Sequence, residues 1–244
     1  MKEFEYEPSA DMGLTPRERL QSVHREAGLV ATFMHRLWWA FVRVYLRVWH
    51  RARVEGRENL PTQVPFVLIA NHTSHLDTML LAAYMPGRLR DKVFPIAAGD
   101  TFFAKTWTSI FAALCLNALP VWRKKVGSHA LSALRERLVD ECCGYILFPE
   151  GTRTRDGKLT KFKPGLGMLL AGTDVPVIPC HLDGAFEALP AGKRFPRPRR
   201  LVLRVGKPIQ FADIANERTG WNHVAETTQS AVSELGVPFT SAAI

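Results

Sequence analysis

The chain has 244 residues, of which 47% are hydrophobic and 23% charged, a composition typical of a globular protein rather than a disordered or fibrous one. Lysine and arginine outnumber aspartate and glutamate by 32 to 23, and the net charge of +9 favours anionic partners such as nucleic acid, a phospholipid surface or phosphorylated metabolites. The four cysteines are too few and too irregularly spaced for a disulfide framework, which indicates a reducing compartment.

The N-terminal stretch is acidic and polar, the opposite of a signal peptide. We predict a flexible tail over residues 1–14, and then a helix that starts at Thr15–Glu18 with a Thr N-cap, a proline at its first position and a capping box. The segment Thr106–Trp122 contains no Asp, Glu, Lys or Arg, but its polar residues and a proline predict a buried helix followed by a strand. No membrane-spanning helix is expected, so membrane association would be peripheral.

Apolar residues recur at helical spacing from Val30 to Trp49, and four arginines lie between them on one flank: Arg36, Arg43, Arg47 and Arg51. A basic amphipathic helix with three tryptophans is typical of a segment that lies flat in a lipid headgroup layer. The alternative is a helix that docks on the core and exposes a solvated basic face. We assign residues 15–55 to an N-terminal helical, membrane-associating segment.

After Gly56, short apolar segments alternate with helical patterns. The predicted strands are Phe66–Ala70, Val93–Ala97, Leu119–Trp122, Tyr145–Phe148, Val175–Pro179 and Leu201–Val205. The predicted helices are Asp77–Tyr84, Ser128–Glu141 and Pro164–Ala171. This alternation predicts an α/β fold with a mixed, largely parallel sheet flanked by helices over residues 56–235. Lys193–Arg200 is expected to be a proline-rich basic loop, and residues 236–244 a frayed end.

A cluster of polar residues, Asn71–Asp77 (NHTSHLD), follows the first predicted strand, at the edge where open α/β sheets place their sites. On one continuous helix, His72 and Asp77 would lie about 140° apart. They can meet if His72 stays in the turn and Asp77 lies in the first helical turn, with Ser74 as N-cap. The pair would then be a candidate general base oriented by a carboxylate. Two alternatives remain: a capping box without catalysis, and a metal site of His72, His75 and Asp77.

A second cluster, Phe148–Arg155 (FPEGTRTR), follows the fourth predicted strand and is followed by three lysines: Lys158, Lys161 and Lys163. A glycine that permits close approach, a hydroxyl group and several cations could form a site for a phosphate-sized anion. The alternative is a solvated basic loop. Glu150 lies among these positive charges and indicates an organised ion-pair network, which favours the anion site.

The third cluster, Val175–Asp183, is by itself a buried strand in which His181 is expected to be structural. The sequence contains no glycine-rich dinucleotide motif, P-loop or nucleophile elbow. Nucleic-acid binding is not expected, because the aromatic residues occur in helical or buried stretches rather than on a stacking sheet.

Taken together, these segments resemble the lysophosphatidic acid acyltransferase (1-acylglycerol-3-phosphate O-acyltransferase) family from about Leu60 to about Gly206. The pattern Asn71-His72-x-Ser74-x-x-Asp77 is similar to the family's first motif, in which the histidine is the general base and the aspartate orients it. Phe148–Arg153 is similar to the third motif, which is associated with the acceptor's phosphate. Val177-Ile178-Pro179 is similar to the fourth, an apolar strand near the acyl-binding region.

The second motif departs from the family pattern. The family has Asp-Arg near the end of a strand, whereas this chain has Trp122-Arg123. Arg123 can still contact a phosphate, but the loss of the acid leaves the acceptor open between 1-acylglycerol 3-phosphate, glycerol 3-phosphate and another lysolipid. The asparagine before His72 favours a lysophospholipid by resemblance.

The resemblance implies transfer of a fatty acyl group from acyl-CoA or acyl carrier protein to a lysophospholipid hydroxyl, with no cofactor and no metal. It implies His72 and Asp77 as catalytic residues, and a set of substrate-binding residues: Asn71, Ser74, Arg123, Glu150, Gly151, Thr152, Arg153, Lys163, Val177, Ile178 and Pro179. The expected location is the cytoplasmic face of a membrane, with an anionic phospholipid surface as partner. The alternatives are a metal-dependent hydrolase on His72, His75 and Asp77, and a non-enzymatic anion- or membrane-binding module.

Overall fold

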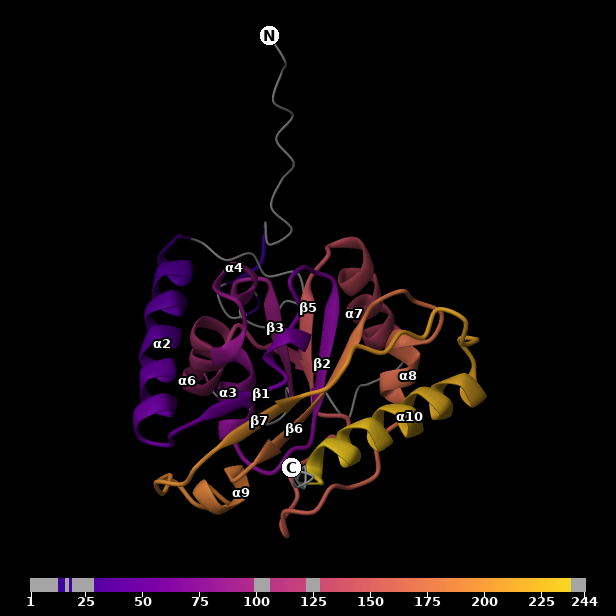
Figure 1. The fold of residues 1–244 in the computed structure, drawn as a ribbon. Helices are drawn as coiled ribbons and strands as arrows, with labels where there is room; N and C mark the ends of the chain where they lie inside the picture. The colour runs from indigo at the N-terminus through magenta and orange to yellow at the C-terminus, as the bar shows by residue number, and fades with distance from the viewer. Residues whose placement is uncertain (1–12, 16–17, 19–28, 99–105, 122–127, 238–244) are drawn as a thin grey trace.

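A seven-stranded sheet forms the centre of the molecule (Figure 1). The structure is a computed structural model and describes residues 13–15, 18, 29–98, 106–121 and 128–237. In chain order the strands are β1 (Arg53–Glu55), β2 (Phe66–Ala70), β3 (Val93–Ala98), β4 (Leu119–Val121), β5 (Gly144–Leu147), β6 (Val177–Asp183) and β7 (Val202–Val205). The longer helices are α2 (Leu29–Val48), α3 (Leu76–Tyr84), α7 (Ser128–Asp140) and α10 (Arg218–Gly236). The shorter ones are η1 (Arg57–Asn59), α4 (Gly87–Arg90), α6 (Thr106–Ile110), η2 (Phe111–Cys115), α8 (Gly165–Leu170) and α9 (Ala185–Ala188).

The order of the strands across the sheet is β1-β7-β6-β2-β5-β3-β4. All neighbours are parallel except β6 and β7, which pair antiparallel. The predicted mixed, largely parallel α/β fold is therefore confirmed. Parallel strands bring their carboxyl ends to the same edge, so the loops after β2, β5 and β6 meet there.

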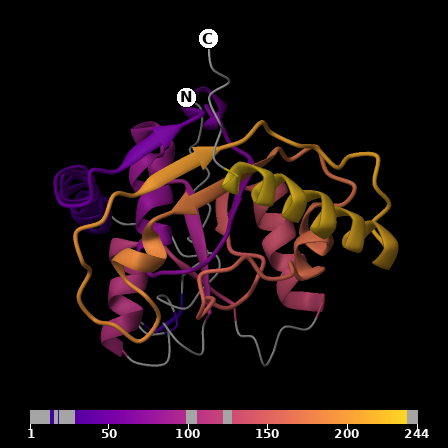
Figure 2. The same ribbon diagram turned by 60° about the horizontal axis from the view of Figure 1, so that its bottom comes forward.

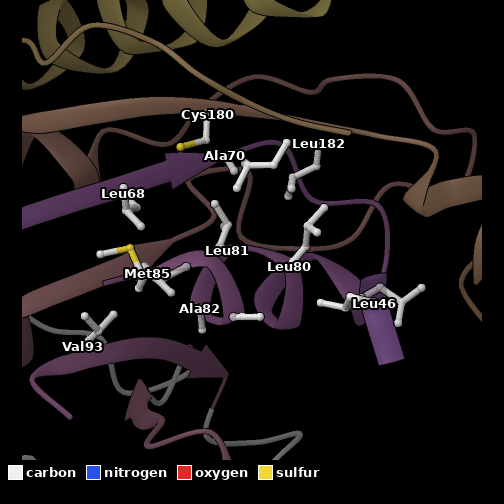
Figure 3. Packing of buried hydrophobic residues seen from close by; sticks show 14 of the residues in the cluster. Leu46, Leu68, Ala70, Leu80, Leu81, Ala82, Met85, Val93, Cys180 and Leu182 are labelled. Atoms are coloured by element: carbon white, nitrogen blue, oxygen red, sulfur yellow. The ribbon is translucent and has the colours of Figure 1, made fainter. Parts of the chain in front are cut away.

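Helices cover both faces of the sheet, with α2, α3 and α6 on one side and α7, α8 and α10 on the other (Figures 1 and 2). β2 is buried along its whole length because it contributes to both hydrophobic layers. Leu68 and Ala70 pack toward α3, where they join Leu80 and Leu81 (Figure 3). Val67 and Ile69 point to the other layer, which α7, α8 and α10 complete.

The short elements β1, η1, α4 and α9 were not predicted from the sequence, nor was the long helix α10. Two of these, β1 and α10, show why a local pattern was missing. β1 has three residues and pairs with β7, from Arg53↔Val202 to Glu55↔Arg204. Residues 53–55, which we had placed in the N-terminal segment, therefore belong to the sheet. α10 buries mainly small or polar residues, which give a weak apolar pattern: Gly220, Val224, Ala225, Thr228 and Val232.

The predicted capping box near the N-terminus is present. The Thr15 N–H and hydroxyl donate to the Glu18 carboxylate (2.8 and 2.6 Å), and the Glu18 N–H donates to the Thr15 hydroxyl at 3.3 Å. Most of the predicted tail and of the helix after Thr15 lies outside the described residues.

α2 has two apolar faces. One face packs on the core through Trp39, Val42 and Leu46, which are at most 1% exposed. The opposite face exposes an apolar stripe, named here the outer stripe of α2: Phe33, Met34, Leu37, Phe41, Val44 and Val48. Arg43 reaches back to the body of the molecule, where its guanidinium donates to the carbonyl of Ala83 (2.7 Å). The helix therefore docks on the core, as one alternative predicted, but the face it exposes is largely apolar.

No helix among the described residues is both long and apolar enough to cross a membrane.

Candidate active site

The turn between β2 and α3 brings His72 and Asp77 together. The Nδ1 atom of His72 lies 3.0 Å from Oδ2 of Asp77, so the predicted meeting of these two side chains is confirmed. Asp77 is fully buried, whereas the His72 side chain remains 19% exposed. Because a carboxylate only accepts hydrogen bonds, Nδ1 carries the proton and Nε2 is left with a lone pair for an incoming group.

The same carboxylate oxygen also holds the turn. Oδ2 of Asp77 accepts hydrogen bonds from the backbone N–H groups of Thr73 (2.7 Å) and Ser74 (2.8 Å). One carboxylate oxygen therefore both binds backbone donors of the turn and orients the imidazole of His72. The His72 ring and the N–H groups of Thr73 and Ser74 together hold this carboxylate in place beside His72.

The expected N-cap was wrong by one residue. His75, not Ser74, is the N-cap of α3, and its side chain makes no capping hydrogen bond. The Ser74 hydroxyl instead donates to the carbonyl of Leu189 at 2.9 Å and accepts from the N–H of Leu76 at 3.2 Å. Ser74 is fully buried, so it connects the turn to the segment after α9.

The metal alternative required His75 to join His72 and Asp77. Within the described ranges, no three His, Cys, Asp or Glu side chains are placed to hold a metal ion. Desolvation, together with the electrostatic influence of Arg153 and of the neighbouring His72 ring, lowers the pKa of His75 to about 4. His75 is thus neutral at neutral pH, and Arg153 is close enough to influence it electrostatically.

Glu150 joins the two motifs through its buried carboxylate. One oxygen accepts from the N–H of His72 at 2.7 Å, and the other accepts from the N–H (2.9 Å) and hydroxyl (2.6 Å) of Thr160. The expected ion-pair network is wrong for this residue, because in the described part of the chain its partners are hydrogen-bond donors and not cations. Only 3% of Glu150 is exposed, so its carboxylate is enclosed among these donors.

The loop after β5 also fixes the ring and the carbonyl of His72. The Phe148 ring stacks on the imidazole with centroids 4.0 Å apart and an angle of 17° between the planes. The N–H of Thr154 donates to the carbonyl of His72 at 2.9 Å. Sequence reasoning assigned no role to Phe148, Thr154 or Thr160. Their positions in or near the FPEGTR motif could have indicated a role in the site. Nothing in the sequence shows which residue each of them contacts.

The cationic part of the site lies in the same loop. Gly151 has a φ angle of +77°, and a Cβ atom there would lie 2.5 Å from Nζ of Lys163, so the lysine side chain crosses directly over the glycine. Thr152 is exposed and Arg153 partly exposed. Gly151, Thr152 and Arg153 share the loop after β5 with Thr154, which bonds to the His72 carbonyl, and the Lys163 side chain crosses this loop at Gly151. That these four residues bind an anion stays a prediction. Arg123, like Trp122, lies outside the described residues.

The remaining predicted residues support the site from the core. The Asn71 side chain forms two hydrogen bonds with the backbone of Leu182 in β6, at 2.9 and 2.7 Å. The apolar motif in β6 is buried and pairs with Val67–Ile69 of β2: Val177, Ile178 and Pro179. These three residues set the register that places Leu182 beside Asn71.

Comparison with known proteins identifies the family to which the chain belongs. The family model described as Acyltransferase matches residues 51–183, which is more than half of the chain and includes both motifs. The chain belongs to this acyltransferase family.

Similar curated proteins are 28–30% identical to the chain over the segments that align. A chloroplastic 1-acyl-sn-glycerol-3-phosphate acyltransferase of Brassica napus is 30% identical over 163 residues, which cover 63% of this chain and 43% of that protein. The alpha form of 1-acyl-sn-glycerol-3-phosphate acyltransferase from Mus musculus is 28% identical over 163 residues, which cover 65% of this chain and 55% of that protein. The chain thus spans about half the length of these relatives.

A solved structure has the same fold as this acyltransferase family member. The crystal structure of the 1-acyl-sn-glycerophosphate (LPA) acyltransferase PlsC from Thermotoga maritima superimposes with a TM-score of 0.63 and 24% identity. The match covers 88% of this chain and 81% of that chain, so it extends to both halves of the sheet.

A cavity of about 1100 Å³ opens at the opposite edge of the sheet from His72. Its lining comes from the segments that precede β2 and β6 and from α7, and includes Leu60–Pro65 and Gly172–Pro176. His72, Asp77 and the Glu150–Arg153 loop do not line it. The motif residues His72, Asp77 and Glu150–Arg153 thus lie at the carboxyl edge of the sheet, away from this cavity.

Proposed function

We propose that the protein transfers a fatty acyl group from an acyl thioester to the hydroxyl group of a lysophospholipid, 1-acylglycerol 3-phosphate. The observation that carries this proposal is the 3.0 Å contact between His72 and buried Asp77, with the cationic loop of Arg153 and Lys163 beside it. The names of the curated relatives support the acceptor. The order and spacing of the two motifs support the same chemistry.

The reaction follows from the proton positions on His72. Nε2 removes the hydroxyl proton as the acceptor oxygen attacks the thioester carbonyl, and a tetrahedral intermediate forms. When it collapses, the C–S bond breaks and the thiol leaves with the proton from Nε2, so His72 returns to its neutral form. The Asp77 carboxylate stabilises the imidazolium during this cycle and keeps Nδ1 protonated. The chemistry requires no acyl-enzyme intermediate, because the thioester is already activated.

Acceptor binding is assigned to the exposed part of the loop after β5. A phosphate is well matched by the guanidinium of Arg153, the ammonium of Lys163 and the hydroxyl of Thr152. Asn71, Ser74 and Glu150 are too deeply buried to contact a ligand. We therefore assign to these three a positioning role, and to Arg153, Lys163 and Thr152 the contact with the acceptor.

Membrane association is assigned to α2. The outer stripe of this helix presents an apolar surface that a bilayer interface can cover, and exposed Arg36 and Arg47 lie along one border of it. Lysophospholipids and long-chain acyl thioesters partition to such surfaces. The protein is thus proposed to act as a peripheral enzyme at the cytoplasmic face of an anionic membrane.

The test is a product assay with the full chain. The protein is incubated with labelled acyl-CoA, or separately with acyl carrier protein, and a panel of lysolipids and glycerol 3-phosphate, and the ester is identified by mass spectrometry. We expect a phosphatidate-type product, and the paired assays identify the donor.

Variants at the turn separate catalysis from folding. His72→Ala should lower turnover by roughly 10²- to 10⁴-fold with an unchanged circular dichroism spectrum, and Asp77→Asn should also be severe. His75→Gln serves as the matched histidine control and should retain most activity. A loss of activity on chelation, together with a His75→Gln defect as deep as that of His72→Ala, would instead support the metal-dependent hydrolase.

A further inference from the structure

The loop between α9 and β7 carries an unusual combination of exposed charge and exposed aromatic surface. Lys193–Arg200 (KRFPRPRR) contains five exposed cations: Lys193, Arg194, Arg197, Arg199 and Arg200. None of them forms an ion pair with a carboxylate among the residues that the structure describes. Phe195 lies between them and is 85% exposed, more than any residue of the outer stripe of α2. The loop thus presents an exposed phenyl ring flanked by exposed cations.

This loop lies next to the end of α2. The buried ring of His50, two residues beyond α2, donates from Nδ1 to the carbonyl of Arg199 at 3.1 Å, and the N–H of Leu201 donates to the carbonyl of His50 at 3.2 Å. Both ribbon views place the loop on the same side of the molecule as α2 (Figures 1 and 2). The outer stripe ends at Val48, and exposed Trp49 follows it. The C-terminal end of the cationic loop therefore lies close to the residue where the outer stripe of α2 ends.

The other end of the loop is rooted beside the candidate active site. Leu189, directly after α9, accepts the hydrogen bond from the Ser74 hydroxyl in the His72 turn. The N–H of Arg197 donates to the carbonyl of Ala188 at 2.8 Å, which folds the loop back on α9. These hydrogen bonds fix the position of the loop relative to His72, so whatever binds the loop is also positioned relative to His72.

We propose that Lys193–Arg200 is a second contact with an anionic bilayer, in which Phe195 enters the interface while the flanking cations bind lipid phosphates. Aromatic rings and basic side chains together are the groups that suit the headgroup region. α2 alone holds the protein along one line about 30 Å long, and rotation about that line would remain free. The loop supplies a second anchor away from the axis of α2. Two anchors prevent this rotation, so the segment that carries His72 keeps one orientation relative to the membrane. The inference rests on the membrane association proposed above.

The apolar groups decide between a bilayer and a folded acidic partner such as a carrier protein. The outer stripe exposes large apolar side chains along α2, and the loop that carries exposed Phe195 lies on the same side of the molecule as this helix (Figures 1 and 2). A planar interface covers both at once, whereas the cations alone would suffice for an acidic protein. A carrier protein is therefore retained as an outcome of the test.

The first measurement is co-sedimentation of the full chain with vesicles of phosphatidylglycerol and phosphatidylcholine, and with vesicles of phosphatidylcholine alone. Phe195→Ser and the double variant Arg194→Gln/Arg197→Gln should each lower partition onto the mixed vesicles by roughly 5- to 30-fold. The charge-matched control Lys207→Gln/Arg218→Gln changes two exposed cations, one after β7 and one at the first residue of α10, and it should bind like the wild type. Unchanged binding of both loop variants would overturn the proposal.

The second measurement separates the possible partners. Loop variants should lose acyl transfer to a vesicle-bound acceptor but keep it with a short-chain acceptor dissolved as monomers. If they lose activity only with acyl carrier protein as donor, with vesicle binding intact, the surface belongs to the carrier protein. Vesicle binding needs no catalysis, so a wild type that binds vesicles through the loop but transfers no acyl group would refute the proposed function and leave this inference standing.

Discussion

Glu150 shows how much of the site depends on a residue that no substrate touches. Its two carboxylate oxygens accept hydrogen bonds from His72 and Thr160, which lie on separate segments. In Glu150→Gln, the amide NH₂ would face a donor, so one hydrogen bond is lost and one buried donor is left unpaired. We expect stability to fall by about 1–3 kcal/mol, and kcat to fall while the KM values change little.

Urea unfolding and steady-state kinetics on the same preparation check this expectation. Thr160→Val is the matched control, because it removes only the hydroxyl donor and should cost about 0.5–1.5 kcal/mol. If Glu150→Gln is as stable and as active as the wild type, the buried carboxylate does not position His72.

Arg153 is expected to recognise the acceptor phosphate. Arg153→Lys keeps the charge but loses the planar, bidentate geometry. A charged hydrogen bond of about 1.5–3 kcal/mol corresponds to a decrease of roughly 10- to 150-fold in kcat/KM for the acceptor. The KM for the acyl donor should stay nearly constant.

Kinetics with each substrate varied in turn, on acceptors with and without the phosphate, measure this asymmetry. Arg155→Lys, an exposed neighbour in the same loop, is the control. Equal losses on phosphate-free acceptors would show that Arg153 holds the loop together and does not read the phosphate.

The contacts around His72 also show what a sequence can and cannot reveal about a site. The His72–Asp77 contact was predictable because only five positions separate the residues and helical geometry limits how they meet. The contact of Glu150 with the backbone of His72 spans 78 positions. It depends on β2 and β5 being neighbours in the sheet, and no local pattern reports that. The acid was visible in the sequence, but its role was not.

Among the elements, apolar runs were sufficient to locate β2–β7. Each of those strands has buried residues on at least one face, and β2 and β6 are buried almost throughout. β1 has the sequence RVE, in which a single apolar residue gives no period. α10 buries few large apolar groups. β1 and α10 were thus missed because tertiary packing, and not a local pattern, holds them in place.

The packing of α10 on β6 makes stability depend on pH. Burial lowers the pKa of His181 below its ordinary value of 6.5, and its Nδ1 donates to the carbonyl of Val232 in α10 at 3.2 Å. The unfolded chain therefore binds this proton more readily than the folded one. Stability from His181 is complete above pH 6.5 and is lost as the pH falls toward the lower folded pKa, by at most about 1.4 kcal/mol per pH unit.

Urea midpoints measured from about pH 7.5 down to about pH 5.5 test this. Gln at position 181 can still donate a hydrogen bond but does not titrate, so His181→Gln should reduce the slope in this interval. His50 contributes to the remaining slope, because burial also lowers its pKa. An unchanged slope in His181→Gln would exclude His181 as a source of acid sensitivity.

At the scale of the whole molecule, charge and apolar surface should act together in membrane binding. The net charge of +9 attracts anionic vesicles, and each lysine or arginine near the surface contributes about 1 kcal/mol. Binding should weaken as salt rises to roughly 0.15 M and beyond, because the Debye length shortens to about 8 Å. Phe41→Ser, in the outer stripe, should lower binding at every salt concentration because it removes apolar contact and leaves the charge unchanged.

Sedimentation with anionic and neutral vesicles across a salt series measures both effects. Val139→Ser, which changes an exposed apolar residue in α7 on the other side of the sheet, is the control. Equal binding to both vesicle types, unaffected by salt, would mean that the arginines of α2 serve another purpose.

The peptide groups on either side of His72 are bonded to the loop after β5: the N–H to Glu150 and the carbonyl to Thr154. An amide in a turn normally exchanges its hydrogen with solvent quickly, but this one should exchange as slowly as an amide of β2, because its release requires the buried carboxylate to be uncovered. The N–H groups of His72 and Thr160 both bond to the Glu150 carboxylate. Conditions that change the hydrogen–deuterium exchange rate of one should therefore change that of the other in the same direction. The two loops would open as one unit, so the protein either presents base and anion site together or presents neither.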